Sequence, residues 1–280
     1  MGMWSERLRS PAGPGFPRIV GHVKLTARRV LVVAGAAVAV IAAAGTALAV
    51  GVPSNPAPGT TSQTVTVPAS GHANAALEVA AGTPVLSIRM ADLGGTHGTL
   101  LRATTPDGAP RPEVRVGAGA AAGRSDESDF VSVSASDGSA PVTITLNSAV
   151  TWLLDFAGGT QRTVADLRGG RVAGIIVAAG SDVVDLTLPR PGAMVPVQLA
   201  GGASQFLLSL PGGVPVRVTA AGGAGEVSLD GQDHTGVGGG SVFATPGWAA
   251  GAAGYDVDAT AGVSRLAVTI QAAASHPAGS

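Results

Sequence analysis

The stretch LAGGASQFLLSLPGGVPVRVTAAGGAGEVSLDG (Leu199–Gly231) contains one phrase twice: a glycine-centred turn followed by a short strand of alternating apolar residues. Further copies are FAGGTQRTVADL (Phe156–Leu167), VAAGSDVVDLTLP (Val177–Pro189) and TAGVSRLAVTI (Thr260–Ile270). The turn glycines recur at intervals of 21 or 22 residues, at Gly159, Gly180, Gly202 and Gly223. A fixed period of this length is typical of stacked repeats.

A second family of alternating strands precedes these turns, for example Val195-x-Val197-x-Leu199 and Tyr255-x-Val257-x-Ala259. Each repeat therefore offers two short strands and a glycine corner, where the backbone can adopt conformations that other residues resist. The sequence predicts an all-β fold, a parallel β-solenoid with rungs of about 21 residues. An antiparallel β-sandwich is the alternative, since it also uses many short strands.

The solenoid repeats are expected over residues 151–272, with an inserted loop at 230–254 that interrupts the period. Trp248 within this loop is a candidate lid over the core. Residues 76–150 are rich in strand patterns and predict an N-terminal cap, because an open end of the stack would expose unpaired strand edges.

Residues Val30–Val52 form a run of 23 residues without a charge, which is long enough to cross a bilayer as a helix. Four basic residues lie just upstream, and the next basic residue downstream is Arg89. The positive-inside rule places the N-terminus in the cytoplasm and the rest outside. The prediction is a single-pass cell-membrane protein with a signal anchor; the alternative is secretion after cleavage near Ala49.

The segments around this helix have compositions of their own. Residues 1–29 carry six basic residues and one acidic residue, and predict a disordered cytoplasmic tail near anionic lipid. Residues 53–75, rich in Pro, Ser, Thr and Gly, predict a linker, and 273–280 a disordered tail. After residue 52 the chain has 17 acidic and 11 basic residues, so no nucleic-acid partner is expected.

Motifs for catalysis, cofactors and metals are missing from the sequence. It contains no cysteine, no GxSxG, no GxxxxGK[ST] and no paired histidines at zinc spacing. Asp230 and Asp233 flank Gly231 without the spacing of a calcium loop, so an ordinary turn is expected. Asp182 and Asp185 are three apart on one strand and should face opposite sides. We therefore assign no catalytic, cofactor-binding or metal-binding residue.

Four segments resemble actinobacterial membrane-anchored proteins of unknown function with an adhesin-like β-repeat domain. They are VTITLNSAVTWLLDFAGG (Val142–Gly159), DLRGGRVAGI (Asp166–Ile175), GGASQFLLSLPGGVPVRV (Gly201–Val218) and GWAAGAAGYDVDATAGVSRLAV (Gly247–Val268). The resemblance covers roughly residues 77–270 and implies a right-handed β-solenoid outside the membrane, without catalytic residues. It supplies no site residue for this chain.

The expected function is a non-catalytic surface module for adhesion or envelope scaffolding. Its expected partners are the lipid bilayer, through Val30–Val52, and either a cell-wall polymer or another envelope protein. An envelope sensor that binds a ligand or partner is the first alternative. An envelope enzyme on a β-helix scaffold, of the carbohydrate-active kind, is the second.

Overall fold

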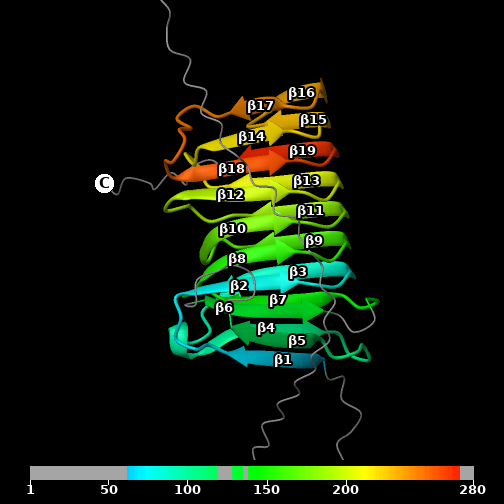
Figure 1. Ribbon diagram of the computed structural model, residues 1–280, viewed down its shortest axis with the longest axis vertical. Coiled ribbons are helices and arrows are strands. Elements are labelled where there is room, and N and C mark those ends of the chain that lie inside the picture. Colours follow the sequence, from blue (N-terminus) through cyan, green and yellow to red (C-terminus); the bar gives the residue numbers. More distant parts are fainter. Residues whose placement is uncertain (1–61, 119–127, 135–137, 272–280) are drawn as a thin grey trace, which may run out of the picture. The chain divides into compact units, whose positions relative to one another are not determined.

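The computed structural model describes residues 62–118, 128–134 and 138–271, which form two mixed β-sheets that do not close (Figure 1). Sheet A has the order β1 (Gln63–Pro68), β4 (Thr99–Thr105), β7 (Val142–Asn147), β3 (Thr83–Ala91), β9 (Thr160–Asp166), β11 (Ser181–Thr187), β13 (Ala203–Leu210), β19 (Val263–Ile270), β15 (Ala224–Leu229), β16 (Gln232–Val237). Sheet B has the order β17 (Ser241–Ala244), β14 (Val216–Ala220), β18 (Gly254–Ala259), β12 (Met194–Leu199), β10 (Arg171–Val177), β8 (Thr151–Phe156), β2 (Asn74–Val79), β6 (Ser128–Ser134), β5 (Glu113–Ala118). A short 3₁₀ turn, η1 (Gly95–His97), precedes β4.

The unit of this structure is a rung: a strand of sheet B, a glycine turn, and the next strand of sheet A. The rungs are β2–β3, β6–β7, β8–β9, β10–β11, β12–β13, β14–β15 and β18–β19. Neighbouring rungs pair in parallel in both sheets. Every antiparallel pair involves one of the outermost strands, which are β1, β4, β5, β16 and β17. An antiparallel sandwich is therefore not what the chain forms.

The order of the rungs in space differs from their order in the chain. The first rung, β2–β3, lies between β6–β7 and β8–β9, and the last rung, β18–β19, lies between β12–β13 and β14–β15. The first and the last rung of the described region are therefore both inserted inside the stack. The strands β1, β4 and β5 form its outer layers at one end, and β16 and β17 form them at the other (Figure 1).

The residue before each turn glycine shows a packing reason for this order. A Cβ on Gly158 would lie 2.3 Å from the carbonyl carbon of Ala81, and one on Gly201 would lie 2.2 Å from that of Ala179. Such contacts are too short, so every second rung requires glycine here. In spatial order the position alternates strictly, as Ala81, Gly158, Ala179, Gly201, Ala261 and Gly222. In chain order it does not, because Gly201 is followed by Gly222.

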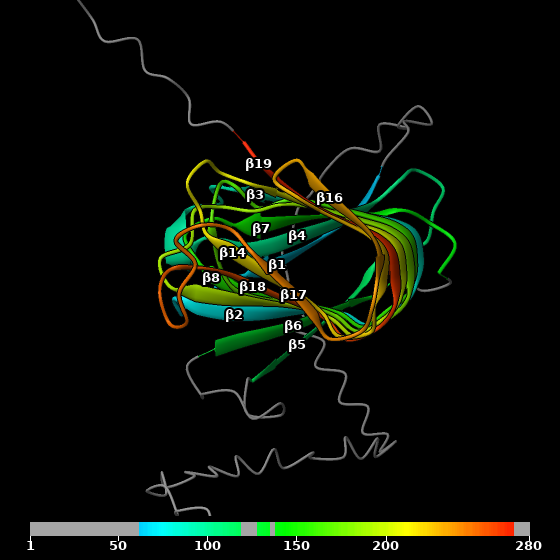
Figure 2. The same ribbon diagram turned by 90° about the horizontal axis from the view of Figure 1, so that it is seen from above.

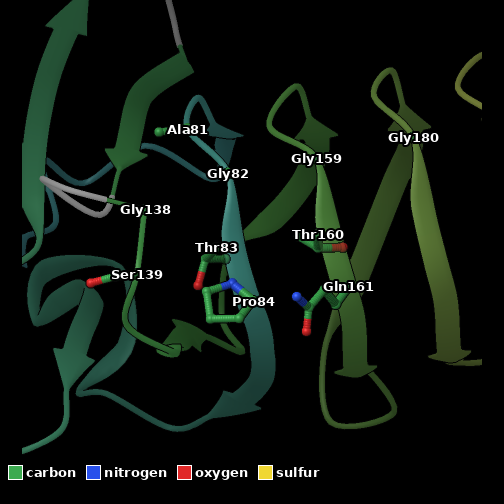
Figure 3. A pocket seen from close by; sticks show the side chains of 10 residues that line it. All are labelled: Ala81, Gly82, Thr83, Pro84, Gly138, Ser139, Gly159, Thr160, Gln161 and Gly180. Carbon is green, nitrogen blue, oxygen red and sulfur yellow. The ribbon is translucent and has the colours of Figure 1, made fainter.

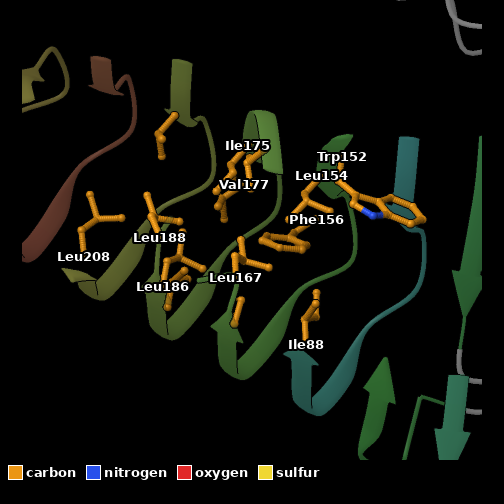
Figure 4. Close-up of a cluster of buried hydrophobic side chains, with 14 of the residues drawn as sticks. Ile88, Trp152, Leu154, Phe156, Leu167, Ile175, Val177, Leu186, Leu188 and Leu208 are labelled. Carbon is orange, nitrogen blue, oxygen red and sulfur yellow. The ribbon is translucent and has the colours of Figure 1, made fainter. Parts of the chain in front are cut away.

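The inward residues of both sheets form one continuous core. Figure 2 looks along the stack, with the strands of sheet A in one layer and those of sheet B in the other. Trp152, Phe156 and leucines of successive rungs fill the space between them (Figure 4). Trp152 is fully buried, and its indole Nε1 donates to the carbonyl oxygen of Asn147 at 2.9 Å. Tyr255 is also buried, and its hydroxyl donates to the carbonyl oxygen of Pro189 at 2.8 Å.

The boundaries of the segments differ from the sequence predictions. Strand β1 and the first residues of β2 lie inside the predicted linker 53–75, and residues 76–150 contain the rest of β2 and the strands β3 to β7. The predicted loop at 230–254 contains β16 and β17, which cover the end of both sheets. No helix among the described residues could span a membrane. The predicted segments 1–29, Val30–Val52 and 273–280 lie outside the described residues.

Candidate functional site

The carboxylates singled out in the sequence do not converge. Asp182 and Asp185 lie on β11 of sheet A, whereas Asp230 and Asp233 lie at and after the turn that follows β15. Among the described residues, no group of three or more His, Cys, Asp or Glu side chains could hold a metal ion. Asp230 and Gly231 form the two-residue turn between β15 and β16, with φ values of 49° and 80°. Positive φ at both positions is typical of a tight β-hairpin, so the predicted ordinary turn is confirmed.

In six of the seven rungs, one position near the glycine turn departs from the simple alternation of buried and exposed residues. Thr83 pairs with Thr160, and Val85 pairs with Arg162. Pro84 and Gln161, which lie between these two pairs, are not register partners. The same gap in the register recurs two residues after each turn glycine. We call these residues the corner column, which in spatial order is Pro84, Gln161, Asp182, Ser204, Ser264 and Gly225.

The corner column explains where Asp182 points. All its members are exposed apart from the half-buried Pro84. Asp182 is exposed and Asp185 is half-buried, so neither side chain lies in the core. Both strands of each pair skip one residue at this place, so the register beyond it is unchanged.

A shallow groove of about 860 Å³ lies along the corner at one half of the stack. It is lined by the glycine turns and by the residues that follow them, among which Thr83, Pro84, Ser139, Thr160 and Gln161 carry side chains into view (Figure 3). Pro84 and Gln161 stand on neighbouring strands, since Thr83 pairs with Thr160. The groove therefore places a side-chain amide beside an apolar ring.

The polar groups of the groove wall are already bonded to one another. Thr83 donates its hydroxyl to the carbonyl oxygen of Ala140 at 2.6 Å, and the hydroxyls of Thr160 and Ser181 lie 2.8 Å apart. The carbonyl oxygen of Gly159 accepts from the backbone N–H of Thr83. The amide of Gln161 makes no hydrogen bond with any residue that the structure describes. It is therefore available to a molecule in the groove.

Trp248 does not cover the core as the sequence suggested. The guanidinium of Arg217 lies 4.3 Å from the centre of its ring. Arg217 belongs to β14 and also donates to both carboxylate oxygens of Asp256 on β18, at 2.8 and 2.5 Å. These residues lie on the outward face of sheet B, because the β14 residues on either side of Arg217 are buried. Trp248 therefore fixes the loop before β18 to the outside of that sheet.

Neither the corner column nor the groove was identified from the sequence. A signal was present, since each column residue stands two positions after a turn glycine. The residue types vary along the column, as Pro, Gln, Asp, Ser, Ser and Gly, so no motif marks it. Its exposure depends on the register between rungs, which the sequence alone does not provide.

No family model and no curated protein sequence matches this chain. Among solved structures, it is similar to a proposed cell-adhesion protein from Clostridium sporogenes, with a TM-score of 0.56 and 18% sequence identity. The match covers 76% of this chain and 100% of that protein. At this identity the similarity concerns the fold.

Proposed function

We propose that this chain is a non-catalytic module that adheres to, or scaffolds, an extended polymer of the cell envelope. Its architecture would be a right-handed parallel β-solenoid, held at the outer face of the membrane by Val30–Val52. Parallel pairing between neighbouring rungs supports the solenoid. The fold shared with a proposed adhesion protein supports the adhesive role.

The observation that carries this proposal is the corner column beside its groove. The column repeats once per rung, which corresponds to about 4.8 Å along the stack. Successive contacts at a constant spacing suit a ligand that is itself long and repetitive. Gln161 offers an amide and Pro84 an apolar ring, and this pair suits polymers that carry both hydroxyl groups and apolar faces.

The test is co-sedimentation of the purified full-length chain with isolated cell-wall polymer. The variant Gln161→Ala removes the amide, and Gln198→Ala is the matched control, because Gln198 is exposed on the outward face of sheet B. One lost hydrogen bond costs about 1 kcal/mol, so binding to the polymer should weaken about fivefold for Gln161→Ala and stay unchanged for the control. Equal binding by both variants would contradict the assignment of the groove.

The same preparation separates adhesion from sensing. Retention of the chain by wall polymer alone, without other proteins, supports adhesion. Recovery with a single membrane protein and no retention by polymer would contradict adhesion and favour the sensor.

The membrane anchor has its own test. N-terminal sequencing of the protein from the membrane fraction should find the residues before Val30 still present. A mature start near Val50, found in the soluble fraction, would refute the anchor.

A further inference from the structure

The outward face of sheet A is electrically divided at its midpoint. The midpoint of its ten strands lies between β9 and β11. On the β1-to-β9 half, the outward charged residues are Arg89, Arg102, Arg162 and Asp166. On the β11-to-β16 half they are Asp185, Glu226, Asp233 and Arg265. One half is therefore mainly basic and the other mainly acidic.

Ion pairs within the chain neutralise the minority charge of each half. Arg168 donates to both carboxylate oxygens of Asp166 at 2.9 and 2.7 Å, and this contact holds the pKa of Asp166 below its ordinary value. Arg265 lies 3.6 Å from Glu226. What remains on the acidic half is Asp185 and Asp233, neither of which forms an ion pair with a described residue.

The basic half is left with three arginines that form no ion pair with a described residue. Arg89 and Arg102 both stand opposite Thr145, on either side of β7. The Nε of Arg89 donates to the Thr145 hydroxyl at 3.1 Å. Two like charges that flank one residue repel each other, and Arg162 adds a third on β9. These three arginines can therefore form ion pairs with carboxylates of another molecule.

Two valines lie at the centre of the face, each with a charged residue as its register partner: Val183 pairs with Arg162, and Val164 pairs with Asp185. Val164 and Val183 are half-buried on either side of the midpoint. Beyond them a depression of about 370 Å³ opens over β13 and β19, lined by Leu207, Ala267 and Asp185 among others. The small side chain of Ala267 leaves this space between longer neighbours. A face that is mainly basic on one half and mainly acidic on the other is self-complementary under a two-fold rotation.

We propose that the outward face of sheet A binds a second copy of this chain, in an antiparallel two-fold dimer. The axis lies in the interface, along the strands and between β9 and β11. It places β9 opposite β11, β3 opposite β13 and β4 opposite β15 of the other copy. Arg162 then meets the strand of Asp185, Arg89 enters the depression, and Arg102 lies nearer to Asp233 than to Glu226, because Glu226 is four residues away along the strands.

The size of the face agrees with such a dimer. Ten strands about 4.8 Å apart and roughly 20 Å long present about 900 Å². A stable protein interface buries about 800 Å² on each partner. The face therefore suffices for one copy, and the charge division sets its orientation, because a parallel arrangement would bring like charges together.

The experiment measures self-association of the full-length chain by light scattering, in mild detergent if it is found in the membrane fraction. The basic-half variant is Arg89→Glu with Arg102→Glu, and the acidic-half variant is Asp185→Arg with Asp233→Arg. Each alone should dimerise at least about tenfold more weakly than the wild type. The control is Arg190→Glu, which reverses one arginine at a turn between β11 and β12 and should leave the dimer unchanged.

Mixing the two variants tests whether the two charged halves meet each other across the dimer. In a mixed dimer, the glutamates introduced in one variant face the arginines introduced in the other, and the two unchanged halves face each other. The two variants should therefore associate as tightly as two wild-type chains. Circular dichroism of each variant checks that it is folded. A monomeric wild type, a dimer that survives both reversals, or variants that fail to restore each other would overturn the proposal.

Discussion

The order of the rungs can be tested with a pair of engineered cysteines, because the chain contains none of its own. Gln198 on β12 is the register partner of Asp258 on β18, which is in turn the partner of Thr219 on β14. Neighbouring strands lie about 4.8 Å apart, so the Cα atoms of Gln198 and Thr219 should be about 9.6 Å apart. A disulfide requires Cα atoms about 4.4 to 6.8 Å apart.

The variant Gln198→Cys with Asp258→Cys should therefore oxidise to a disulfide within one chain, and Gln198→Cys with Thr219→Cys should not. Mobility on a non-reducing gel and titration of free thiols measure the outcome. The bond would close a loop of about 60 residues and should stabilise the fold by roughly 4 kcal/mol. If the rungs instead followed the order of the chain, Gln198 and Thr219 would be neighbours. Efficient bonding of that second pair would refute the insertion of β18–β19.

Three further predictions concern the core and the corner. Tyr255→Phe should cost about 1 kcal/mol by urea unfolding, since the bond to Pro189 is lost. Burial raises the pKa of Tyr255, the only tyrosine, so unfolding frees a phenol that ionises at lower pH. Wild-type stability should fall as pH rises above about 10, and the Phe variant should fall less steeply; parallel profiles would contradict this. Gly201→Ala should destabilise the fold by about 1–3 kcal/mol or more, whereas Gly192→Ala, with nothing within 4 Å, should be nearly neutral in the same thermal melt. Trp152→Ala should cost about 3–5 kcal/mol in urea unfolding; a cost below about 1 kcal/mol would mean that this side chain is not buried.

The strands of the rungs could be predicted from the sequence because one physical requirement appears in each copy. Alternating residues must fill the core, and a glycine must follow where the chain turns. Val195, Val197 and Leu199 are all buried on β12, as the alternation indicates. The order of the rungs could not be predicted, since every interior strand offers the same pairing edges. The residue before each turn glycine alternates between Ala and Gly in the spatial order of the rungs. This alternation can be recognised only after the spatial order is known.

The ends of the stack were harder to predict for a different reason. Strand β1 (QTVTVP) lies in a segment whose Pro, Ser and Thr content is typical of a linker, and its pairing with β4 overrides that composition. The turn at Asp230 and Gly231 was itself a hairpin signal, yet the glycines that follow it concealed β16. The corner column was missed because period-two alternation assigns its residues to the core.

The inserted rungs also determine how this fold can change in length. A simple repeat stack loses its outermost layer when the chain is shortened and gains one when the end is duplicated. Here, a chain that stops before β18 would lose a layer from the interior, and β14–β15 would lose the rung that joins them to β12–β13. During synthesis, β14 to β17 can therefore take their final places only after β18–β19 has been made. Natural variants of different length are expected to differ in the middle rungs, β8 to β13. There the order in the chain is the order in space, so a rung can be added without changing the inserted rungs at either end.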